Sequence, residues 1–96
     1  MELNEQIFDE LSQCELTDQQ IKLIGRMVYQ ICEDFELGLL NIYDDGDDIR
    51  ITLLDEMEQQ GASIFDDELE ILNGENEDEV EAFVKTFINE LKIRFS

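Results

Sequence analysis

Residues 42–48, with the sequence IYDDGDD, place four aspartates around one glycine. Clustered carboxylates are the ligands that Ca²⁺ prefers, so a calcium-binding loop is the first hypothesis. If Gly46 is aligned with the glycine of a calcium-binding helix–loop–helix motif, the first, third and last ligand positions fall on Asn41, Tyr43 and Thr52. Only Asn41 is a suitable ligand, and no glutamate closes the loop. We therefore expect no specific metal site and no cofactor, with a weak, nonspecific divalent-cation site as the alternative.

The chain offers few groups for nucleophilic or acid–base catalysis. It has no histidine, and its two cysteines, Cys14 and Cys32, match neither a zinc pattern nor a disulfide framework. Cys32 falls in the apolar stripe of an expected helix, which is typical of a small buried residue, and Cys14 has no histidine to activate it. Acidic pairs are plentiful, but no spacing singles out a catalytic pair. We expect two reduced thiols, no catalytic residue and no enzymatic activity.

Charge is the unusual feature of this sequence. The 96 residues include 26 acidic and 6 basic side chains, which give a formal net charge of −20. The charge is uneven, because residues 44–81 alone hold 16 acids and one base, a net charge of −15. Duplex DNA carries one negative charge per about 1.7 Å of axis, so twenty charges correspond to roughly 34 Å of duplex. A folded chain of this length has a diameter on the order of 30 Å, so the two charge densities are comparable.

Apolar residues make up 43% of the chain, which is too many for a disordered acidic tail, and the length suits one domain over residues 1–96. Helical spacing of apolar residues predicts helices over 2–13 and from a Thr17 cap to a stop at Gly38. A last helix is predicted after Asn76, with Glu79 in its capping pattern.

Between these helices the pattern indicates strands. Asp45-Gly46 predicts a two-residue hairpin turn that pairs Ile42 with Ile49 and Leu40 with Ile51. This register places Leu40, Ile42, Ile49, Ile51 and Leu53 on one face, and Asn41, Tyr43, Asp48, Arg50 and Thr52 on the other.

The segment that follows the hairpin has a weaker pattern. Residues 53–60 suit either a short helix or an irregular extension of the strand, and Gly61 ends the segment in both cases. Alternation at 68–71 predicts a third strand within 63–74. The expected fold is a small single α+β domain, α-α-β-β-β-α, with helices packed on one face of a three-stranded antiparallel sheet.

Two absences bear on where the chain acts. It has no apolar run of membrane-span length, and its start, MELNEQIFDEL, lacks the basic and apolar stretches of a signal peptide. We expect a cytoplasmic protein with no membrane partner, located in the host cell's cytoplasm if a phage encodes it.

Three explanations compete for the acidic side chains. A solvated surface predicts charge spread evenly around the molecule, and a divalent-cation site needs a ligand arrangement that is missing here. The third is a binding protein whose acidic surface engages a basic one, since complementary charge speeds encounter and rejects wrong partners. The concentration of acids in 44–81 favours the third explanation. Direct binding to nucleic acid is not expected, because like charges repel.

In size, charge and α+β design the chain resembles a class of small acidic inhibitors that phages and mobile elements use against restriction enzymes and CRISPR effectors. It resembles in the same way the immunity proteins that neutralise nuclease toxins. The resemblance covers composition and transfers no residue roles. It implies a non-enzymatic inhibitor or DNA mimic that occupies the basic, nucleic-acid-binding surface of a target protein; the alternative is an acidic interaction or cation-binding domain without mimicry.

The carboxylates expected to replace phosphates opposite Arg and Lys of the target all lie between residues 44 and 77. They are Asp44, Asp45, Asp47, Asp48, Glu56, Glu58, Asp66, Asp67, Glu68, Glu70, Glu75 and Glu77. Whether Tyr43 or Phe65 supplies an apolar anchor stays open, as does the oligomeric state.

Overall fold

The computed structural model describes residues 2–95, which form one antiparallel sheet and the helices that pack against it. The predicted α+β class and the three-stranded antiparallel sheet are confirmed, and a short additional helix follows the last strand. The elements are α1 (Leu3–Ser12), α2 (Asp18–Phe35), β1 (Gly38–Asp44), β2 (Asp48–Asp55), β3 (Glu58–Phe65), α3 (Asp66–Leu72) and α4 (Glu77–Phe95).

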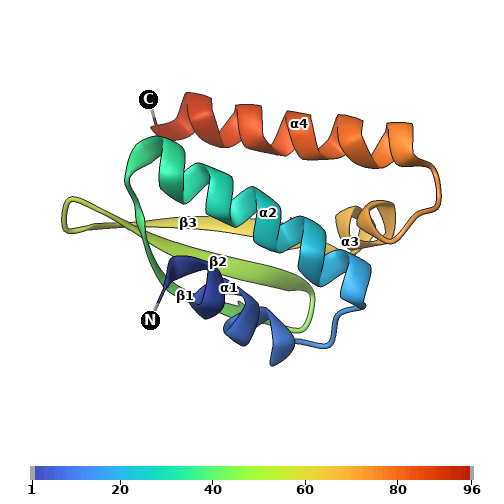
Figure 1. Ribbon diagram of the computed structural model, residues 1–96, viewed down its shortest axis with the longest axis horizontal. Coiled ribbons are helices and arrows are strands. Elements are labelled where there is room, and N and C mark those ends of the chain that lie inside the picture. The colour runs from blue at the N-terminus through green and yellow to red at the C-terminus, as the bar shows by residue number, and fades with distance from the viewer. Residues whose placement is uncertain (1, 96) are drawn as a thin grey trace.

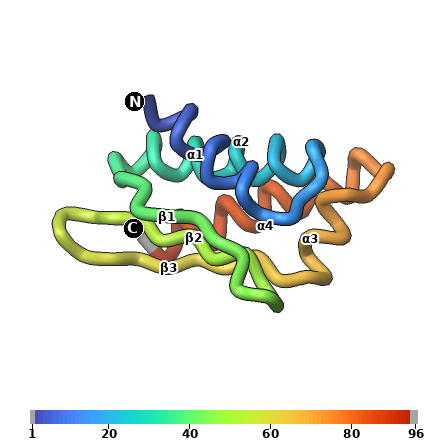
Figure 2. Tube along the Cα trace, turned by 90° about the horizontal axis from the view of Figure 1, so that it is seen from below, coloured from blue at the N-terminus to red at the C-terminus, as the bar shows by residue number. Residues whose placement is uncertain are grey.

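The helices α1, α2 and α4 lie on one side of the sheet, whose strand order is β1-β2-β3 (Figures 1 and 2). The core between the two layers is aliphatic: Ile24 and Ile31 of α2 and Ile51 and Ile64 of the sheet are almost fully buried. Burying such side chains is the main favourable contribution to folding in a domain of this size. The opposite face of the sheet has no helix over it (Figure 2).

Two helix starts follow their sequence signals. The Gln20 N–H donates to Thr17 Oγ1 at 3.2 Å and the Thr17 N–H donates to Gln20 Oε1 at 2.9 Å, so the predicted capping box is present. Asn76 Oδ1 accepts from the Glu79 N–H at 3.3 Å, as expected for the cap of α4. The stop of α2 differs from the prediction: the helix ends at Phe35, and the left-handed residue that terminates it is Glu36, with φ of 54°.

The predicted register of the first hairpin is wrong by two residues. Ile42 pairs with Ile51 and Asp44 pairs with Ile49, and the Asp45 N–H donates to the Asp48 carbonyl at 2.9 Å, so the chain turns at Gly46-Asp47 and not at Asp45-Gly46. A shift of two keeps every side chain on its own face, and Ile42, Ile49, Ile51 and Leu53 are all buried, as expected. Leu40 is the exception: the register shifts between Leu39 and Asn41, which leaves Leu40 40% exposed and buries Leu39.

A tight two-residue turn joins β2 and β3. Asp55 pairs with Glu58, and the two residues between them both have positive φ, 45° at Glu56 and 83° at Met57. These are the backbone conformations of a type I′ hairpin turn, which matches the twist of the flanking strands. Residues 53–60 are therefore strand and turn, and the helical alternative is wrong. Gly61 does not end the segment, as was predicted, but lies inside β3.

The third strand was predicted too late in the chain. It ends at Phe65, and the segment from Asp66 onward is helix α3. The acidic residues at the start of this segment favour a first helical turn, where Glu68 Oε1 accepts the Phe65 N–H at 3.1 Å. The short alternation at 68–71 fits both the two-residue period of a strand and the 3.6-residue period of a helix. Leu72 is buried and Leu69 is partly buried, which is the spacing of a helix.

Candidate functional site: an acidic end of the domain

Most of the predicted carboxylates lie at one end of the molecule, which we call the acidic end. Strand pairing creates it: Asp48, at the start of β2, pairs with Phe65, at the end of β3, and α3 begins at the next residue. The connection between β1 and β2 therefore lies beside the first turn of α3. The predicted site residues at this end are Asp44, Asp45, Asp47, Asp48, Asp66, Asp67, Glu68, Glu70, Glu75 and Glu77.

The two long helices α2 and α4 also begin at this end (Figure 1). Side chains of α2 hold the arrangement together, since Gln19 Nε2 donates to the Leu72 carbonyl at 2.8 Å and Gln20 Nε2 donates to the Leu69 carbonyl at 2.9 Å. Helix N-termini carry partial positive charge, which offsets part of the repulsion among nearby carboxylates. The topology thus explains why so many acids can be placed together at this end.

Between α3 and α4 these acids surround a shallow depression of about 300 Å³. Asp67, Glu70 and Glu75 line it, and so does Glu79. A neighbouring hollow is lined by Glu75 and Glu77 together with Asp18, Glu81 and one base, Lys22. Asp18, Glu79 and Glu81 were not among the predicted site residues. Asp18 and Glu79 lie in the first turns of α2 and α4, which was the available signal, whereas Glu81 lies in the second turn of α4 and is paired with Arg26. Only the tertiary structure joins those helices.

Arg50 is the only base within residues 44–81, and carboxylates hold it. Its Nε lies 3.3 Å from Asp45 Oδ2 and 3.5 Å from Asp48 Oδ2. Asp48 was expected on the exposed surface, but it is only 5% exposed, the one buried charged residue among those described. This corrects the prediction for Asp48: its carboxylate is engaged with Arg50 and cannot present itself to a partner as the exposed acids can.

Two other predicted site residues have local roles in the chain. Asp44 Oδ1 accepts the Gly46 N–H at 2.8 Å, which fixes the turn between β1 and β2. The side chain of Glu68 is occupied at the start of α3. By contrast, within residues 2–95 the exposed carboxylates of Asp47, Glu70 and Glu75 make no hydrogen bond or ion pair. These three are therefore among the carboxylates that are available for contact with another molecule.

Glu56 and Glu58 do not belong to the acidic end. They lie at the turn between β2 and β3, which the antiparallel sheet places at the opposite end of the molecule (Figure 1). The predicted set of twelve is therefore divided between two distant regions. Tyr43 and Phe65, the two candidate anchors, are 42% and 54% exposed. Both lie on the uncovered face of the sheet, because Tyr43 pairs with Arg50 and Phe65 with Asp48, two residues apart in β2.

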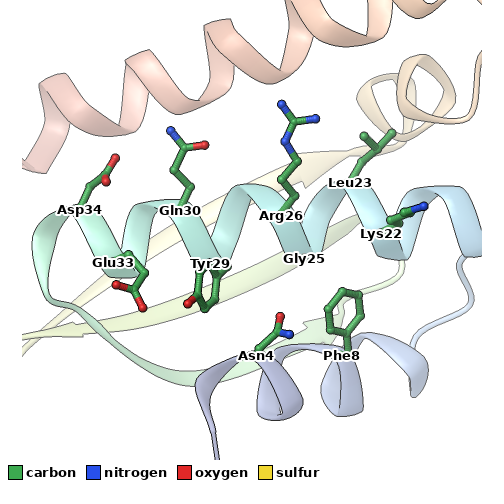
Figure 3. A pocket seen from close by; sticks show the side chains of 10 residues that line it. All are labelled: Asn4, Phe8, Lys22, Leu23, Gly25, Arg26, Tyr29, Gln30, Glu33 and Asp34. Carbon is green, nitrogen blue, oxygen red and sulfur yellow. The ribbon is translucent and has the colours of Figure 1, made fainter.

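A second surface feature is a groove of about 580 Å³ along α2. Phe8 from α1 and Tyr29 from α2 point into the space between these helices (Figure 3). Gly25 forms the floor, and a Cβ there would approach the Phe8 ring to 3.1 Å. The rim carries both signs, and Arg26 is bound to Glu81 across a 3.0 Å ion pair. The groove therefore lacks the excess of carboxylates found at the acidic end.

The thiols and the remaining perturbed groups have ordinary structural causes. Burial raises the pKa of Cys32 to about 11, and burial with the Asp44 and Glu10 carboxylates raises the pKa of Cys14. A hydrogen bond with Glu33 raises the pKa of Tyr29. Both cysteines are free thiols. None of these shifts produces a reactive nucleophile, since a nucleophilic thiol requires a lowered pKa.

Three further findings bear on function. Within residues 2–95, no group of three or more His, Cys, Asp or Glu side chains is arranged to hold a metal ion. None of the helices in that part of the chain combines the length and apolar character needed to cross a membrane. Comparison with protein-family models, with curated proteins and with solved structures finds no match.

Proposed function

We propose that this protein is a small, non-enzymatic inhibitor that acts in the cytoplasm by occupying the basic, nucleic-acid-binding surface of another protein. The observation that carries the proposal is the collection of carboxylates at the acidic end, where the β1–β2 connection, α3 and the starts of α2 and α4 meet. A merely solvated surface would spread its acids around the molecule.

The charge density supports the comparison with nucleic acid. The longest dimension of the domain is 38 Å. A duplex of that length carries about 22 phosphate charges, close to the net charge of this chain. Exposed carboxylates such as Asp47, Glu70 and Glu75 would accept charge-assisted hydrogen bonds from Arg and Lys side chains that otherwise bind phosphate oxygens. The chemistry of the surface therefore fits restriction enzymes, CRISPR effectors and nuclease toxins as classes of target.

The test compares two triple variants with equal changes in charge. The first, D47N/E70Q/E75Q, removes carboxylates at the acidic end that make no local contacts. The second, E5Q/E33Q/E36Q, removes three exposed carboxylates that lie outside it, in α1, in α2 and at the residue that follows α2. Partners are recovered from the soluble extract at low salt, and their affinity is then measured at about 50 and 200 mM salt, with and without duplex DNA as competitor.

We expect the parent to recover a basic, nucleic-acid-binding protein and to compete with DNA for it. The acidic-end triple should bind that protein about tenfold more weakly or worse, with a smaller salt dependence, and the control triple should bind like the parent. Equal losses in the two triples would show that only net charge matters. Recovery of a neutral partner, or binding that DNA does not oppose, would contradict the proposal.

A further inference from the structure

The turn between β2 and β3 has a backbone that its residues do not favour. Glu56 and Met57 both have positive φ, and Glu36 is the only other non-glycine residue with this property among those described. Asn-Gly or Gly-Gly is the usual choice for a turn of this type, because side chains with a Cβ clash in the left-handed region. A sequence that disagrees with its own local structure at a tight turn is a sign that the residues serve another purpose.

Met57 is also the most exposed large hydrophobic side chain in the described part of the chain. It is 92% exposed, compared with 77% for Ile93 and 54% for Phe65. The turn projects beyond the layer of helices at the end of the β2–β3 hairpin (Figures 1 and 2). Met57 therefore contributes nothing to the core, and neither packing nor turn geometry explains its presence.

The neighbours of Met57 indicate what could receive it. Asp55, Glu56 and Glu58 flank it in the sequence, so the apolar tip is surrounded by carboxylates. An anionic membrane surface would repel these charges, and a second copy of this chain would bring another net charge of −20. A basic protein is the class of partner that the charges admit. A flexible, polarizable methionine suits an apolar pocket on such a surface.

We propose that Met57 is an apolar anchor that inserts into an apolar pocket rimmed by Lys and Arg on a basic partner protein. The inference rests on the proposed function for the class of partner, but it uses residues at the opposite end of the molecule from the acidic end. In this proposal Glu56 and Glu58 belong to a second contact with the partner protein, separate from the acidic end. One buried apolar anchor ringed by polar contacts is a common arrangement at binding hot spots.

The test uses E56N/M57G, which keeps the turn and removes both the anchor and the Glu56 carboxylate, beside E56N alone, which removes only the carboxylate and should bind more tightly than the double variant. The double variant should melt at a higher temperature than the parent yet bind the partner recovered at low salt about tenfold more weakly or worse. M57L retains an apolar side chain of similar size and should bind within about threefold of the parent. A residue with only a structural role could not move stability and affinity in opposite directions.

A photo-crosslinking amino acid at position 57, added to soluble extract, should form an adduct with a basic protein, and one at Lys85 on α4 should not. An E56N/M57G variant that binds like the parent, an absence of adducts from position 57, or an adduct between two copies of the chain would each overturn the inference. If D47N/E70Q/E75Q loses affinity but E56N/M57G does not, the anchor fails and the acidic-end site stands. If E56N/M57G loses affinity but D47N/E70Q/E75Q does not, the anchor stands and the acidic-end site fails.

Discussion

The turn at Glu56 and Met57 allows a stability prediction whose magnitude follows from backbone geometry. Each L-residue held in the left-handed region costs roughly 1–2 kcal/mol, and the two φ values here are 45° and 83°. Asn relieves part of that cost at position 56 and Gly relieves nearly all of it at 57, while the added glycine costs about 0.5–1 kcal/mol in unfolded-state entropy. We therefore expect E56N/M57G to raise the free energy of unfolding by about 1 kcal/mol.

For a chain of this length, that change corresponds to a rise in melting temperature of roughly 4–8 °C, measurable by circular dichroism. The matched experiment is G46A in the β1–β2 connection. Gly46 has φ of 98°, and a Cβ added there would meet no atom within 4 Å, so the strain of an alanine is purely backbone strain. We expect G46A to destabilise by about 1 kcal/mol or more. If E56N/M57G melts at or below the parent's temperature while G46A behaves as expected, the assignment of strain to Glu56 and Met57 is refuted.

Three other predictions concern charge and the thiols. Raising the salt concentration from about 20 to 500 mM should raise the melting temperature, since screening weakens repulsion among the acids; a fall would contradict this. In the native protein a thiol reagent at pH 8 should modify Cys14 before Cys32, whose pKa is raised to about 11 by burial, and urea should remove the difference. The hydrogen bond from Arg26 lowers the pKa of Glu81, so its stabilising effect is present above the unfolded pKa and is lost as the pH falls through the folded one. R26Q should raise the Glu81 pKa in an NMR titration, and an unchanged value would exclude that cause.

The sequence predicted the elements whose signals are local. The Thr17 and Asn76 caps and the apolar stripes of α2 and α4 depend on residues three or four positions apart, so each can be recognised without knowing the rest of the fold. The alternation in β2 likewise identified its buried face. This assignment is correct although the predicted register is wrong by two residues, because every second residue of a strand lies on the same face.

The sequence misplaced what depends on pairing between strands. Asp45-Gly46 has the strongest turn signal in the chain, yet the first hairpin turns one residue later, at Gly46-Asp47, and a type I′ turn formed at Glu56-Met57, where the residues disfavour it. Strand register is set by burial of β1, β2 and β3 against the same helices, and that free energy exceeds the preference of any one turn. The same pairing buries Asp48 beside Arg50, and no local sequence pattern predicts this burial.

The sequence alone determined that this protein has a negative charge per unit length comparable to that of duplex DNA. It also determined that residues 44–81 carry most of that charge. It could not determine where those charges lie in space, because segments that are neighbours in the chain separate along antiparallel strands. Glu56 and Glu58 are carried to one end of the sheet, and Asp47 and Asp66 to the other. Only the tertiary structure brings the starts of α2 and α4 to that second end, where their partial positive charges allow the carboxylates to gather.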